Sequence, residues 1–331
     1  MRLCLKNFAV PTVLLVLLSA TAASRATSCT MQAELTPQDR ATLASAGGLL
    51  AQAVAQQDYA ALKAALLPAV AQDWDGIHEA AEAGAALMKG GKIQLQNVFL
   101  LDATSLTAPA DTQFFCSNAD GSLTVTLTMR ALPPGRYAVM LAESAGAPYD
   151  GQLGFILVWD GPATGWKLGG LTARPGILDG QDGAAWWKQA RELAKEGQSW
   201  SAWYAYETAR MLLLPVDFLS SPNLDKLGTE QGSIKNSPLD AFPLTLQDGA
   251  RTWKIDAVRV DPSLLHADLG VIFESTGVTD PAAQRTEAIA VLSTFLKAQP
   301  GLKDNFHGLW AYAVKDRKRT PVLELPMAQI P

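Results

Sequence analysis

The sequence predicts an α+β protein in which N-terminal helices precede an antiparallel sheet, and a helical hairpin leads to a small C-terminal α+β domain. Three observations predict this class. Apolar residues recur at helical spacing over residues 36–89, alternate with a period of two over 92–173, and return to helical spacing over 182–214. The 331 residues are sufficient for two medium-sized domains. A hydrophobic content of 48% excludes a wholly disordered chain.

Residues 1–28 have the order of a secretory signal peptide. Two basic residues precede a short apolar run at 10–18, and small residues follow it. The run is shorter than the roughly 20 residues of a transmembrane helix, and no other segment is apolar enough to span a bilayer. Cleavage is expected after Ala22 or Ala26, and an uncleaved N-terminal anchor is the alternative. The sequence therefore predicts export to the periplasm or the cell surface.

The charge of the chain argues against nucleic-acid binding. Lys and Arg together number 27 and Asp and Glu number 32, which gives a net charge of −5. Cleavage near residue 26 would remove Arg2, Lys6 and Arg25, and the mature chain would be still more acidic. Such a chain is not expected to bind nucleic acid or anionic lipid.

Two of the three cysteines lie beyond the predicted signal. Cys29 and Cys116 form an even pair, which favours a disulfide in an oxidising compartment. Such a bond would close a long loop and stabilise the fold by about 4 kcal/mol in the chain-entropy model. Alternatively, residues 26–29 resemble a degenerate bacterial lipobox, although Ala26 and Ser28 depart from its pattern, and Cys29 would then carry a lipid anchor. The two interpretations compete for the same sulfur atom.

Three helices are predicted at the start of the mature chain. Thr36 is a typical N-cap and Pro37 suits the first helical position. Asp58 can cap a second helix, and a third is expected over 75–89, ended by Gly90.

A meander of antiparallel strands is expected next. The segment 122–130 places apolar residues on one face and polar residues on the other. The expected strands are 92–101, 122–130, 136–143, 152–159 and 166–172.

The order of helices followed by strands over residues 30–175 resembles the NTF2-like, cystatin-like cone, and the whole chain resembles an exported bacterial protein. The resemblance implies a curved sheet with a helix packed into its concave face, which leaves a pocket. Tyr137, Trp159 and Trp166 are candidates to line this pocket. The alternative is that these aromatic residues belong to the core. Because members of this family include enzymes as well as binding and scaffold modules, the fold alone would not fix the function.

The second half of the chain is predicted to contain a connector, a linker and a further domain. The Trp-rich hairpin at 179–216 resembles one tetratricopeptide-type unit, but only one copy is present, which favours a helical connector. Turn-forming residues over 217–240 predict a polar linker. Residues 241–331 are expected to form a ββαββ domain with antiparallel pairing, with strands at 252–260, 266–274, 307–314 and 322–325 and a helix at 281–299.

Motifs for metal or cofactor binding are weak, and the sequence predicts no metal site and no cofactor. The helix from His78 to Glu82 resembles a zincin motif but lacks the second histidine. If the C-terminal domain has a site, we expect it at His307 with a carboxylate such as Glu274 or Glu324; the alternative is a structural histidine.

These features favour a non-catalytic binding or scaffold protein with a small ligand or a protein partner. The observation behind this prediction is that no convincing catalytic constellation is present. The alternative is an enzyme, a hydrolase or an isomerase, that uses the pocket of the N-terminal cone. A further possibility is assembly through an exposed sheet face or hairpin.

Overall fold

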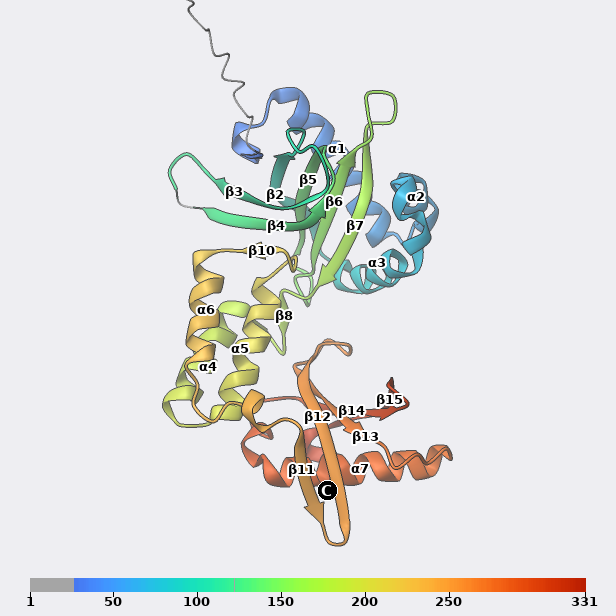
Figure 1. The fold of residues 1–331 in the computed structure, drawn as a ribbon, viewed down its shortest axis with the longest axis vertical. Helices are drawn as coiled ribbons and strands as arrows, with labels where there is room; N and C mark the ends of the chain where they lie inside the picture. The colour runs from blue at the N-terminus through green and yellow to red at the C-terminus, as the bar shows by residue number, and fades with distance from the viewer. Residues whose placement is uncertain (1–26, 122) are drawn as a thin grey trace, which may run out of the picture.

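The computed structural model describes residues 27–121 and 123–331, and these form an α+β fold. In Figure 1 the N-terminal helices and sheets lie at the top, helices α4 to α6 lie in the middle, and the C-terminal sheet with α7 lies at the bottom. The predicted cleavage positions, Ala22 and Ala26, lie outside the described residues. No helix within the described ranges is long and apolar enough to cross a membrane.

Three helices cover one face of a five-stranded antiparallel sheet. The predicted caps are confirmed, because the Thr36 side chain accepts a hydrogen bond from the Asp39 amide and Asp58 accepts one from the Ala61 amide. Leu43 and Met140 lie in the core between the helices and the sheet. The helices are α1 (Pro37–Ala55), α2 (Tyr59–Ala65) and α3 (Trp74–Met88), and the strands, in sheet order, are β1 (Ser28–Met31), β2 (Lys92–Asp102), β5 (Arg136–Ala145), β6 (Gln152–Trp159) and β7 (Trp166–Arg174).

The opposite face of this sheet is covered by a second sheet, which the predicted single meander did not contain. Strand β4 (Thr124–Leu132) pairs with β3 (Ala110–Ser117) and with β10 (Leu219–Ser220) instead of joining β2 and β5. Its alternation was correctly interpreted, since Val125 and Leu127 are buried in a core between the two sheets. The hairpin of β3 and β4 is not part of the first sheet, because β2 and β5 pair directly with each other.

The predicted disulfide between Cys29 and Cys116 is present and joins the two sheets. It links β1 to β3, with Cα atoms 5.3 Å apart and 87 positions apart in sequence. Ser28, the first residue of β1, pairs with Asp102 of β2. The folded part of the chain therefore includes the last residue of the predicted signal segment. Because the Cys29 sulfur is bonded, it is not available for the lipid anchor considered as the alternative.

The predicted helical hairpin is confirmed, and it shares one core with the C-terminal sheet. The Trp186 ring stacks on Phe306 at 5.9 Å, and Trp200 packs against Phe295. Asp182 caps the first helix by accepting a hydrogen bond from the Ala185 amide. The hairpin comprises α4 (Gly183–Lys195) and α5 (Ser199–Leu213), and it follows the short strands β8 (Ile177–Leu178) and β9 (Gln181–Asp182).

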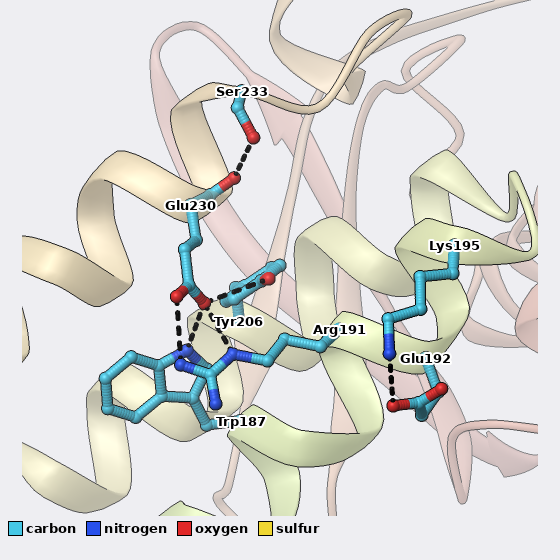
Figure 2. Close-up of polar contacts among 7 residues, drawn as sticks. All are labelled: Trp187, Arg191, Glu192, Lys195, Tyr206, Glu230 and Ser233. Atoms are coloured by element: carbon cyan, nitrogen blue, oxygen red, sulfur yellow. Dashed lines mark hydrogen bonds and ion pairs between the residues drawn. The ribbon is translucent and has the colours of Figure 1, made fainter.

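The segment 217–240, predicted as a linker, contains helix α6 (Pro222–Gly232) and packs against the hairpin. Figure 2 shows that Glu230 of α6 receives hydrogen bonds from Trp187 Nε1 at 2.7 Å and from two nitrogens of Arg191 at 2.7 and 2.9 Å. These Arg191 hydrogen bonds hold the pKa of Glu230 below its usual range. The turn-forming residues of this segment did not predict α6. The contacts of Glu230 hold this helix against the hairpin.

The C-terminal domain has the element order βββαββ rather than ββαββ. Strand β11 (Leu244–Asp248) is additional, and β13 and β14 are parallel rather than antiparallel. The parallel pairing follows from the connection, because helix α7 (Pro281–Ala298) carries the chain back across one face of the sheet. The remaining strands are β12 (Arg251–Asp261), β13 (Asp268–Glu274), β14 (Gly308–Lys315) and β15 (Lys318–Pro326), in the sheet order β11-β12-β13-β14-β15.

Candidate functional site

Carboxylate and histidine side chains meet on three neighbouring strands of the C-terminal sheet. Asp268 begins β13, His307 directly precedes β14, and Glu324 lies in β15. Leu269 and Leu325, next to these acids in sequence, point into the core shared with α7. Because side chains alternate along a strand, Asp268 and Glu324 lie on the sheet face opposite α7.

The three side chains converge closely. His307 Nδ1 lies 2.8 Å from Asp268 Oδ1. One ligand atom from each of Asp268, His307 and Glu324 can be chosen so that all three lie within 4.8 Å of one another. Gly308 leaves room for this approach, since a Cβ atom there would lie 2.6 Å from Glu324 Oε1 and 3.0 Å from Asp268 Oδ1.

Burial places both carboxyl groups in an unfavourable environment. The Asp268 side chain is fully buried, and its Oδ2 atom, like Glu324 Oε1, has no hydrogen-bond partner among the described residues. Burial raises the pKa of Asp268, while the His307 hydrogen bond opposes that rise. Burial also raises the pKa of Glu324, and the nearby charge of Asp268 raises it further. Each ionised carboxylate can only accept, so its unpartnered oxygen needs a hydrogen-bond donor, a proton or a cation.

A second histidine adjoins the cluster. The His266 ring stacks on His307 with ring centroids 3.8 Å apart and planes 12° from parallel. Asp179 holds His266, with Oδ1 2.6 Å from His266 Nδ1, and its Oδ2 accepts a hydrogen bond from the Ala267 amide. Asp179 and Gly180 both have positive φ and form the two-residue turn between β8 and β9. The turn therefore connects the helical hairpin to the cluster.

The structure brings together two of the three residues predicted for a C-terminal site. His307 and Glu324 lie in the cluster, whereas Glu274, at the other end of β13, forms an ion pair with Lys254. Asp268 was not predicted. In the sequence Asp268 is only a lone acid at the start of an apolar strand. It can be assigned to the cluster only when the register of β13 against β14 is known.

The aromatic residues predicted for an N-terminal pocket lie on different faces of the sheet. Trp159 and Trp166 face each other across β6 and β7, with ring centroids 5.3 Å apart. The Arg136 guanidinium lies 6.0 Å from both rings and pairs with Asp39. Tyr137 belongs to the core between the two sheets, and its hydroxyl donates to the Pro133 carbonyl.

Trp166 borders a cavity of about 420 Å³ between α1, α2 and β7. Its walls are mainly small or aliphatic, with Gln52 and Gln56 adding two amides. Asp58 is the one acidic or basic residue among those that line it, and this carboxylate is engaged as the cap of α2. Leu49 also lines the cavity and is 66% exposed.

Comparisons of the chain with protein-family models, with curated proteins and with solved structures give no match. The two places described above, the N-terminal cavity and the C-terminal cluster, are therefore interpreted from their own geometry.

Proposed function

We propose that this protein is an exported, non-catalytic binding protein that takes a small apolar ligand in the cavity between α1, α2 and β7. The observation that carries the proposal is the cavity itself, about 420 Å³ with mainly apolar walls. This volume lies in the range of small-molecule sites, which are typically lined by apolar side chains with a few polar groups. Trp166 offers a flat apolar wall, and Gln52 and Gln56 offer hydrogen bonds to a polar group on the ligand.

Export is part of the same proposal. The N-terminal order of basic, apolar and small residues supports a cleaved signal peptide. The Cys29–Cys116 disulfide supports an oxidising compartment, the periplasm or the cell exterior. We also propose an NTF2-like cone for residues 30–175, supported by the packing of α1 to α3 on one face of an antiparallel sheet.

A hydrolase or isomerase in this cavity has weaker support. Acid–base catalysis uses titratable side chains positioned at the reacting atoms, commonly an acid together with a base. Asp58 alone has such a side chain among the residues lining the cavity, and it accepts a hydrogen bond from the Ala61 amide. The lining therefore favours binding over catalysis.

The proposal can be tested with the fluorescent apolar probe N-phenyl-1-naphthylamine. We expect the wild-type chain to bind the probe and to enhance its fluorescence. Ala61→Trp fills the cavity from α2 and should abolish the enhancement. Ala64→Trp is the matched control, because Ala64 is exposed on the same helix and does not line the cavity.

A second pair of variants tests the mouth of the cavity. Leu49→Asp should weaken probe binding at least about tenfold, because it places a charge against the apolar walls. Leu239→Asp is the control, since Leu239 is 65% exposed and lies elsewhere. The proposal is wrong if the wild-type chain does not bind the probe, or if the control variants lose binding as strongly as their partners.

A further inference from the structure

We propose that Asp268, His307 and Glu324 form a site for a divalent transition-metal ion, with Zn²⁺ as the ion to test. This site is independent of the cavity in the N-terminal half. Two carboxylates and an imidazole are a common ligand set for zinc and related ions. The ligand atoms come from β13, from β15 and from the residue directly before β14, the strand between them, and they lie within 4.8 Å of one another.

The three side chains are near enough for their ligand atoms to reach one ion after small movements. Zinc binds oxygen and nitrogen at about 2.0–2.2 Å, so two ligands at a tetrahedral angle lie about 3.4 Å apart. Asp268 Oδ1 and His307 Nδ1 lie 2.8 Å apart, which is within this separation. Small side-chain adjustments would therefore bring the three ligands around one ion.

The unpartnered oxygens point to a cation rather than to chance proximity of acids. Asp268 is fully buried, yet its Oδ2 atom has no hydrogen-bond partner within the described chain, and Glu324 Oε1 shares this condition. Buried polar atoms are nearly always paired in native proteins. A divalent ion would satisfy both oxygens and neutralise both charges. The competing explanation is a proton shared between the two carboxyl groups.

The surroundings of the ligands support a built site. Gly308 keeps the space between Glu324 and Asp268 free of a side chain. His266 stacks on the His307 ring and is itself held by Asp179. These contacts restrict the orientation of the His307 ring.

Three protein ligands would leave at least one coordination position for water or a small anionic ligand. Structural zinc sites have four protein ligands, whereas three ligands with an open position are typical of sites that bind or activate a further molecule. The cluster therefore fits a metal that exchanges an outer ligand. His307 is partly exposed, which provides access from solvent.

The test is isothermal titration of the full mature chain with Zn²⁺ after removal of metals with a chelator. We expect one ion per chain, and Asp268→Asn and Glu324→Gln should each weaken binding at least about tenfold. Glu274→Gln is the matched control, because Glu274 is an acid of the same sheet that pairs with Lys254 outside the cluster. Near-ultraviolet circular dichroism must show that each variant compared is folded.

A second measurement covers the case in which a ligand variant fails to fold. Co²⁺ bound to the wild-type chain should give visible absorption bands, and their absence would contradict the site. The proposal is overturned if the wild-type chain binds Zn²⁺ more weakly than about 100 µM. It is also overturned if Glu274→Gln loses as much affinity as Glu324→Gln. In the first case the two acids share a proton, and in the second the metal binds outside the cluster.

Discussion

Breaking the disulfide between Cys29 and Cys116 should destabilise the N-terminal half of the molecule and leave the C-terminal half unchanged. The bond joins the edge strand β1 of one sheet to β3 of the other. Strand β1 has only four residues and forms its strand pairing with β2 alone. The disulfide therefore adds a covalent cross-link between the two N-terminal sheets, beyond the chain connections from β2 to β3 and from β4 to β5.

The magnitude follows from the length of the closed loop. The two cysteines are 87 positions apart, and the chain-entropy model gives about 4.6 kcal/mol for a loop of this length. With a denaturant slope of about 2 kcal/mol per molar urea, this loss lowers the unfolding midpoint by roughly 2 M. The double variant Cys29→Ala/Cys116→Ala should lose about as much as the reduced wild-type chain.

Hydrogen exchange followed by mass spectrometry is the appropriate assay, because it separates the two halves. Peptides from β3 and β4 should lose protection on reduction, whereas peptides from α7 should keep theirs, since α7 belongs to the separate C-terminal core. The reasoning is refuted if reduction leaves protection in β3 and β4 unchanged. It is also refuted if a chain that begins after Ala26 shows two reactive thiols when it is unfolded without reduction.

Three further substitutions test polar contacts of the fold, each by urea unfolding. Glu230→Gln weakens the contact with Arg191 and should cost about 1–2 kcal/mol at neutral pH. Because the pKa of Glu230 is lowered by these hydrogen bonds, the wild-type contribution is complete above the ordinary carboxyl pKa and is lost as pH falls through the lowered value, so the difference should vanish in acid. Asp182→Ala removes the cap of α4 and should cost about 1 kcal/mol; equal stability would contradict the capping role. Tyr312→Phe leaves Asp261 Oδ2 without the hydroxyl that donates to it at 2.5 Å and should cost about 1–3 kcal/mol; a variant as stable as wild type would contradict this role of the hydroxyl.

The helices could be predicted where local signals are strong, and the register of the strands could not. Thr36 and Asp58 mark helix starts by short-range chemistry that the sequence displays directly. Strand β3 was missed because Phe114, Phe115 and Cys116 form an apolar run that hides the alternation. In the structure Phe114 and Cys116 are buried, while Phe115 is 73% exposed.

The residues of the candidate cluster could likewise be predicted only in part from the sequence. His307 and Glu324 were predicted together, but Glu274 was an equal candidate because the sequence does not reveal the register of three strands. The parallel pairing of β13 with β14 places Asp268 beside His307 and moves Glu274 to the far end of the sheet. A strand, a helix and a strand in succession favour parallel pairing, and this signal was available in the sequence.

The unit that carries the cluster begins well before residue 241, where a C-terminal domain was predicted. Trp186 and Tyr204 of the hairpin are 2% exposed, and they lie in the same core as Phe273 and Phe295. A fragment that starts at 241 would expose the face of the sheet and α7 that these aromatic residues cover, and burying a side chain of this size contributes about 1.5–3 kcal/mol. The same fragment would lack Asp179, which holds His266 against the cluster. We therefore infer that the smallest stable unit with an intact cluster begins near Ile177, and that the hairpin is part of this unit rather than a connector between two independent domains.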